Sequence, residues 1–148
     1  MVKVEVQYAL KDGSTPNEED FQKWASVIES KIYSADEVAL RIVDENEITH
    51  LNEQYRKKSG PTNVLSFPAE LHNEIDVSFL GDIIICAPIV VKEAEEQDKT
   101  LLSHWAHMTV HGILHLQGYD HINDQDAAVM EALEMEILEK LDFANPYA

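Results

Sequence analysis

The sequence predicts an α+β fold, in which a small mixed sheet of about four strands is covered by about five helices. Two observations carry this prediction. Strand-like segments concentrate in residues 1–86, whereas residues 87–148 show mainly helical spacing of apolar side chains. With 148 residues, 45% hydrophobic content and no linker-like stretch, the chain is expected to form a single domain over residues 1–148.

The first half of the chain begins with a strand that leads into a helix. Residues 2–9 alternate apolar and polar side chains, as a strand does, and residues 17–33 carry apolar side chains at helical spacing. Residues 37–43 are expected to form the second strand. Asp44 or Asn46 then caps a short helix, because both residue types are favoured at that position.

Two further strands are expected before the chain becomes helical. A turn signal precedes residues 64–67, a short apolar strand that Pro68 closes. Residues 70–77 are a polar connection, and residues 79–86 form the next strand, which Asp82 interrupts.

Three helices complete the expected fold. Pro88 is well placed to begin a helix that runs to residue 97. Residues 100–117 form the second helix, in which Trp105 faces the core and Gly112 allows close approach. The last helix is capped by Asn123 or Asp124 and presents one apolar face, which carries Met130, Leu133, Ile137 and Leu141.

The composition favours a cytoplasmic protein. The N-terminus lacks the apolar block of a signal peptide, and the longest uncharged apolar run, residues 83–91, is shorter than the roughly 20 residues of a membrane span. A single cysteine, Cys86, excludes an internal disulfide and is expected to be a buried thiol of little reactivity.

The net charge of −17 argues, taken alone, against a nucleic-acid partner, because affinity for a phosphate backbone depends on Lys and Arg. Many of the acids are expected on two solvated helix faces, residues 17–20 and 131–139. Residues 56–58, Arg-Lys-Lys, are the basic cluster of the chain. The positive charge at residues 56–58 can therefore oppose the negative net charge of the chain.

Three histidines with a glycine between them, His111, His115, Gly118 and His121, have the spacing of a divalent-metal site. Histidines four residues apart on a helix rise by about 6 Å and share one face. Gly118 can end the helix in the left-handed conformation and turn His121 back toward the same point. Three neutral imidazoles leave a fourth tetrahedral position for water, as in catalytic zinc sites.

Chance does not readily produce this pattern, although seven histidines make isolated helical pairs unremarkable. From the chain's own His and Gly frequencies, it is expected in about one chain in two thousand of this length. The same spacing occurs in metzincin peptidases, where the residue after the first histidine is a general-base glutamate. Here that residue is Gly112, which argues against a peptidase.

The motif HGILHLQGYDH at residues 111–121 resembles the signature of the bacterial YbeY family. The segments LNEQYR at residues 51–56, TNVLSFP at residues 62–68 and LGDII at residues 80–84 are similar to the same family. One departure is visible, because the family usually has Asp where this chain has Asn63.

The resemblance implies a single-domain, metal-dependent and single-strand-specific endoribonuclease. Its expected roles are maturation of ribosomal RNA, notably the 3′ end of the 16S RNA, and ribosome quality control. Expected partners are ribosomal RNA, the small ribosomal subunit and its assembly factors. It also implies that His111, His115 and His121 hold the metal, expected to be zinc, and that Arg56 and His111 act in cleavage.

Arg56 suits such a role because a planar guanidinium can pair with phosphate through two hydrogen bonds. The alternative is a solvated cation at a helix end. Asp120 is expected either to orient a ligand imidazole or to stabilise a turn. His107 lies one turn before His111, where a surface position is favoured over the border of a cleft. Ser66 is expected to make strand or turn hydrogen bonds.

Three functions therefore compete: a metal-dependent ribonuclease, a metallopeptidase or other hydrolase, and a noncatalytic assembly module that a metal stabilises. Gly112 speaks against the peptidase, and the open fourth ligand position speaks against a purely structural ion. The acidic surface favours an encounter in which ribosomal proteins or an assembly factor deliver the RNA.

Overall fold

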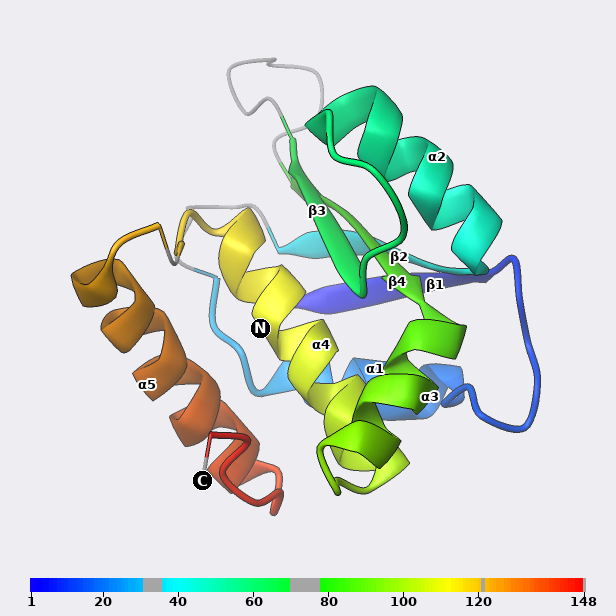
Figure 1. The fold of residues 1–148 in the computed structure, drawn as a ribbon. Helices are drawn as coiled ribbons and strands as arrows, with labels where there is room; N and C mark the ends of the chain where they lie inside the picture. The colour runs from blue at the N-terminus through cyan, green and yellow to red at the C-terminus, as the bar shows by residue number, and fades with distance from the viewer. Residues whose placement is uncertain (31–35, 70–77, 121, 148) are drawn as a thin grey trace.

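The fold is a mixed four-stranded sheet with helices on both faces (Figure 1). A computed structural model of the protein describes residues 1–30, 36–69, 78–120 and 122–147. Within these ranges the chain forms four strands and five helices, so the predicted fold class is confirmed. The connection predicted at residues 70–77 lies outside the described residues.

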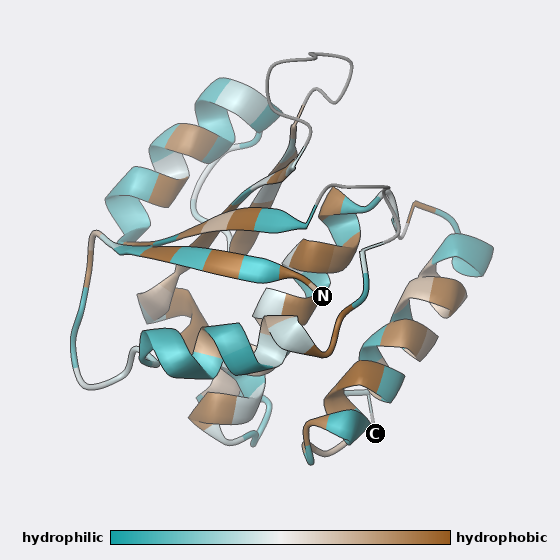
Figure 2. Ribbon diagram, turned by 180° about the vertical axis from the view of Figure 1, so that it is seen from behind, coloured by the Kyte–Doolittle hydropathy of each residue, from teal (hydrophilic) through white to brown (hydrophobic). Residues whose placement is uncertain are grey.

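The sheet has the strand order β1-β2-β4-β3, which the sequence pattern does not define. The strands are β1 (Lys3–Tyr8), β2 (Glu37–Val43), β3 (Val64–Pro68) and β4 (Phe79–Cys86). β1, β2 and β4 run parallel, whereas β3 pairs antiparallel with β4 and forms an edge. Hydrophilic and hydrophobic residues alternate along β1, as Figure 2 shows, because successive strand side chains point to opposite faces.

Four of the five described helices begin at a capping side chain. The helices are α1 (Glu18–Ser26), α2 (Glu45–Arg56), α3 (Ala87–Glu96), α4 (Leu101–Leu116) and α5 (Asp124–Lys140). α3 has no capping side chain and carries Pro88 in its first turn. Side-chain oxygens of Asn17, Asp44, Thr100 and Asn123 accept hydrogen bonds from backbone N–H groups three residues later. Asp44 and Asn123 are thus the caps, where the sequence left two candidates each.

The first helix is shorter than the predicted residues 17–33. It ends at Ser26, and the carbonyl of Ile28 accepts a hydrogen bond from the backbone of Val2 at 3.1 Å. The chain therefore leaves the helix to bond with the start of β1. Ile28 is still buried, whereas Ile32 lies outside the described residues.

Two apolar clusters hold the layers together. The larger one joins one face of the sheet, including Ile83 and Ile85, to α1, α4 and α5, with Trp105 fully buried. The smaller one lies on the opposite face, where Ile84 and the buried thiol of Cys86 pack with the α2 side. α4 therefore crosses the sheet beside β3 and β4, while α2 covers the other face (Figure 1).

None of the helices in the described part of the chain combines the length and apolar character that a membrane span requires.

Candidate metal centre and cleft

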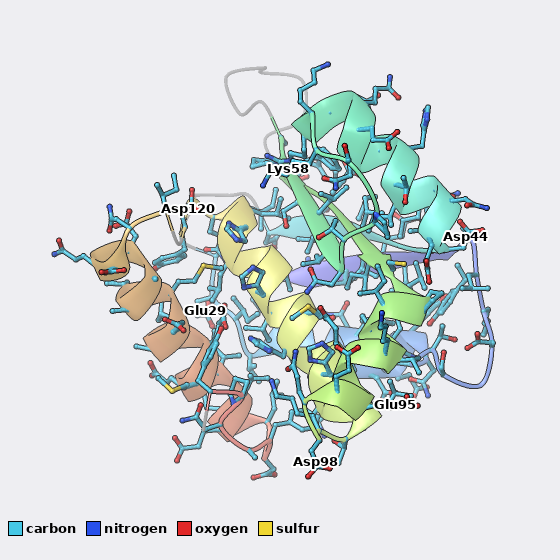
Figure 3. All side chains as sticks on the ribbon, viewed as in Figure 1. Glu29, Asp44, Lys58, Glu95, Asp98 and Asp120 are labelled. Atoms are coloured by element: carbon cyan, nitrogen blue, oxygen red, sulfur yellow. The ribbon has the colours of Figure 1, made fainter. Side chains whose placement is uncertain are left out.

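A cleft of about 710 Å³ opens between the end of α2, strand β3 and the end of α4. Its lining includes Arg56 and Lys58 from the α2 side, and His111 and His115 from α4. Figure 3 labels Lys58 and Asp120, which border the cleft from the segments after α2 and after α4. The cleft brings together residues that are far apart in the sequence.

His111 and His115 lie one turn apart on α4, as their spacing predicts. Their ring centroids are 4.6 Å apart, and both side chains are half-buried and line the cleft. α4 is thus the element that carries two of the three predicted metal ligands.

The end of α4 turns the chain as predicted. Gly118 has φ +96°, and its N–H donates to the carbonyl of His115 at 3.0 Å, while the N–H of Tyr119 donates to the carbonyl of Leu114 at 3.2 Å. This pair of bonds is a Schellman motif, which favours glycine because the backbone adopts positive φ. The third predicted ligand, His121, lies three residues later and outside the described residues.

A buried carboxylate from α5 contacts the histidines of α4. Oε1 of Glu134 lies 2.7 Å from Nδ1 of His111, and Oε2 lies 2.7 Å from Nε2 of His107. The hydroxyl of Tyr147 donates to the same Oε2. Glu134 is completely buried and His107 is 6% exposed. The predicted surface position of His107 is therefore wrong, and Glu134 is an exception to the solvated face predicted at residues 131–139.

These contacts determine the charge of the carboxylate. Burial alone would raise the pKa of Glu134, but hydrogen bonds from His107, His111 and Tyr147 outweigh burial and lower the pKa to about 2. Glu134 is therefore ionised at neutral pH. An ionised carboxylate can accept a hydrogen bond from Nδ1–H of His111. In the neutral His111 ring that has its proton on Nδ1, Nε2 carries the lone pair. This donor set fits a metal such as zinc.

The same trio offers a second way to hold an ion. One ligand atom each from His107, His111 and Glu134 lies within 4.8 Å of the others, so this group could also bind a metal. Glu134 was not predicted from the sequence, although a signal was present. Glu134 occupies the central position of the apolar stripe on α5, whose other members are Met130, Ile137 and Leu141.

Arg56 reaches the cleft from the last turn of α2. Its Nη2 donates to the backbone carbonyl of Ser66, and its guanidinium lies 5.2 Å from the ring centroid of Phe67. Arg56 is exposed, but the contacts with Ser66 and Phe67 restrict its side chain. The side chain is therefore partly ordered before a ligand binds. Arg56, His111 and His115 thus line one cleft.

The face of α4 on which Gly112 lies packs against the sheet and not against the cleft. A Cβ built on Gly112 would lie 2.9 Å from Cγ2 of Ile83, which is closer than real Cβ atoms approach. The prediction of close approach at Gly112 is therefore confirmed. A peptidase-like glutamate at this position would collide with the core.

Comparison with known proteins agrees with this geometry. The family described as Endoribonuclease YbeY matches residues 6–142. The chain belongs to the YbeY family. A solved relative is TM1509 from Thermotoga maritima, whose solution structure has a TM-score of 0.55 and 26% sequence identity. The similarity covers 96% of this chain and 92% of TM1509, and the YbeY family is a family of endoribonucleases.

Asn63, where the resemblance to the YbeY family leads us to expect Asp, contacts the half-buried acid Glu93. Its Nδ2 donates to Oε1 and Oε2 of Glu93 at 3.1 and 3.3 Å. Oε1 of Glu93 is also 2.9 Å from Nε2 of His104, which is 2% exposed. The amide thus donates to Glu93 at a position where an Asp side chain would place a second negative charge.

The remaining candidate residues have structural positions. The hydroxyl of Ser66 donates to the carbonyl of Gly112 at 3.4 Å, so its hydrogen bond reaches α4 and is not the predicted strand or turn bond. Asp82 is exposed and is not part of the cleft lining. Cys86 is buried, and burial raises its pKa, as expected for an unreactive thiol.

Proposed function

We propose that this protein is a metal-dependent endoribonuclease that cuts single-stranded ribosomal RNA. We propose further that it matures the 3′ end of the 16S RNA and acts in ribosome quality control, in the cytoplasm and together with the small ribosomal subunit and its assembly factors. In this proposal residues 1–148 act as one domain. The observation that supports it best is the shared cleft of His111, His115 and Arg56.

His111, His115 and His121 are the proposed metal ligands, and zinc is the proposed ion. A zinc ion held by imidazoles supplies either an activated water or a Lewis acid that polarises a phosphate. His111 and His115 support this assignment because both rings line the cleft from one face of α4.

Arg56 is the proposed phosphate-binding and charge-stabilising residue. Its planar fork can pair with two nonbridging oxygens, where charge develops as the phosphodiester is cut. Contacts with Ser66 and Phe67 already restrict the side chain. Less conformational entropy is then lost when the guanidinium binds phosphate.

Local charge supports an RNA ligand in spite of the net charge of −17. Among the described residues that line the cleft, Arg56 and Lys58 are cationic, whereas Asp120 is the carboxylate. A polyanion therefore meets attraction in the cleft and repulsion over much of the remaining surface. This arrangement favours RNA that a ribosomal partner delivers.

Two alternatives make different predictions. A metallopeptidase needs a general base near the metal, and the packing of Gly112 on Ile83 leaves no room for one at the metzincin position. A noncatalytic assembly module would bind zinc and the small subunit but would not cut RNA.

The test combines zinc analysis with cleavage of precursor 16S RNA, presented both naked and within small-subunit particles. We expect His115→Ala to lose bound zinc and cleavage together. His50→Ala is the matched control, because His50 is exposed on α2 and outside the cleft lining. Wild-type protein that carries zinc and leaves both substrates intact would refute the proposed activity and favour the assembly module.

A further inference from the structure

The carboxylate of Glu134 joins three donors from two other segments of the chain. Oε1 is hydrogen-bonded to Nδ1 of His111, and Oε2 is hydrogen-bonded to Nε2 of His107 and to the hydroxyl of Tyr147. The two histidines come from α4 and Tyr147 from the segment after α5. A buried carboxylate is costly unless donors satisfy it, so this arrangement requires all of these groups in defined orientations.

The hydrogen bonds define which nitrogen of each ring carries the proton. Both oxygens of Glu134 are engaged as acceptors, Oε2 also by the hydroxyl of Tyr147, so His111 bears its proton on Nδ1 and His107 bears its proton on Nε2. The two neighbouring rings are thus held in opposite tautomers. Nδ1 of His107 is buried without a hydrogen-bond partner in the described part of the chain, as suits a nitrogen without a proton.

The tautomer of His111 matters because a metal binds the nitrogen that carries the lone pair. With the proton on Nδ1, that nitrogen is Nε2. A carboxylate on the far side of a ligand imidazole also makes the ring more basic and restricts its rotation.

We infer that Glu134 is the positioning residue of this site, whose carboxylate fixes His111 in the Nδ1–H tautomer so that Nε2 serves as a metal ligand. The inference rests on the proposed function, because it takes His111 as a ligand. Glu134 acts through His111 and contacts neither the metal nor the RNA. Tyr147 supports it by donating to the other carboxylate oxygen.

Separations within the trio favour hydrogen bonds over a metal between His107, His111 and Glu134. Two ligands at about 2.05 Å from a tetrahedral zinc are about 3.3 Å apart. Both nitrogen–oxygen separations to Glu134 are 2.7 Å, which is the length of a charge-assisted hydrogen bond. Both contacts to Glu134 therefore have the geometry of hydrogen bonds.

The first test reads the tautomers directly in the wild-type protein and needs no variant. Long-range ¹H–¹⁵N correlation spectra of the metal-free protein are recorded at pH about 8, above the ordinary imidazole pKa of about 6.5. We expect His111 as the Nδ1–H tautomer and His107 as the Nε2–H tautomer. A predominant Nε2–H tautomer of His111 would overturn the inference.

The second test measures zinc affinity by competition with a chromophoric chelator. Glu134→Gln presents one acceptor in place of two, so we expect zinc to bind about 10- to 100-fold more weakly. Glu136→Gln is the matched control, because it makes the same change at an exposed position of α5. We expect Tyr147→Phe to weaken binding less than Glu134→Gln, since both histidine contacts remain.

Comparison of two histidine variants distinguishes the remaining outcomes. Under the inference, His115→Ala abolishes zinc binding and His107→Gln weakens it only modestly. Loss of zinc in His107→Gln with retention in His115→Ala would show that the trio itself holds the ion, and would overturn the inference. Wild-type zinc affinity in a folded Glu134→Gln would also overturn it, while leaving the ribonuclease proposal intact. A wild-type protein that binds no zinc would refute the metal proposal instead.

Discussion

The backbone of Gly112 lies directly against the side chain of Ile83. A Cβ at Gly112 would approach Cγ2 of Ile83 to 2.9 Å and Cδ1 to 3.0 Å. Since Gly112 follows His111 on α4 and Ile83 lies in β4, a central strand, this contact sets the distance between the sheet and the helix that carries the proposed metal ligands.

Replacement of Gly112 by Ala should destabilise the protein by about 1–3 kcal/mol, because overpacking outweighs the gain in helix propensity. The same replacement in an Ile83→Ala background should stabilise the protein by up to about 1 kcal/mol, since the obstructing atoms are gone. Urea unfolding of the four proteins of this double-mutant cycle measures both values. An equal effect of Gly112→Ala in the two backgrounds would contradict the contact.

Arg56→Gln should lower the cleavage rate by about 10²- to 10³-fold, because it removes a donor to the developing charge. Arg56→Lys should recover only part of the rate, since an ammonium lacks the planar fork. Zinc content should stay at the wild-type level in both variants. Lys57→Gln is the control, because it removes the neighbouring charge from outside the cleft lining. Equal losses in Lys57→Gln and Arg56→Gln would assign the effect to net charge.

Asn63→Asp should destabilise the protein by about 1–3 kcal/mol at neutral pH, because it replaces a donor to Glu93 by a second carboxylate. Glu93→Gln should restore most of this loss, since its amide can donate to Asp at position 63 and still accept from His104. The measurement is the free energy of unfolding of the double-mutant cycle. Additive effects would mean that the two side chains do not interact.

His104 should make the protein less stable in mild acid. Burial lowers its pKa and outweighs the opposite effect of Glu93. Below the ordinary imidazole pKa of about 6.5, the unfolded chain binds a proton at His104 that the folded protein excludes. This contribution to stability is therefore complete above about pH 6.5 and is lost as the pH falls toward the lower, folded-state pKa.

The test of this pH effect compares His104→Gln with the exposed control His50→Gln. The dependence of the unfolding free energy on pH between about 7 and 5 should be weaker in His104→Gln than in wild type. An unchanged dependence would show that His104 does not exclude its proton.

Naked single-stranded RNA should bind weakly and with a shallow dependence on salt. The two cations of the cleft lining, Arg56 and Lys58, predict a slope of log K against log salt of about −1.4. Arg56→Gln should reduce the slope by about 0.7. Filter-binding titrations at several salt concentrations measure both slopes. Tight binding with a steep slope would contradict delivery by a ribosomal partner.

Local rules in the sequence were sufficient for most elements of the fold. The caps of α2 and α5, the turn at Gly118 and the burial of Trp105 depend on neighbouring residues or on helical spacing. The predicted end of the helix over residues 17–33 was wrong, because α1 ends at Ser26. Its apolar spacing continues to Ile28, but the backbone of Ile28 bonds to Val2, which is distant in the sequence.

The candidate site also combines features that are visible along the chain with features that only the tertiary structure sets. The sequence identified His111, His115 and Arg56 as chemically suited residues, because their types and spacing are visible along the chain. Their meeting in one cleft depends on the strand order β1-β2-β4-β3, which places β3 between the ends of α2 and α4.

The sequence by itself thus determined most of the secondary structure, the apolar faces of the helices and the histidine pattern, because these follow from contacts within a few residues. Tertiary structure alone decided that Glu134, on an otherwise apolar stripe, turns its carboxylate to His107 and His111. The physical reason is that a buried charge is tolerated only where donors from other segments satisfy it, and packing of α5 against α4 supplies them.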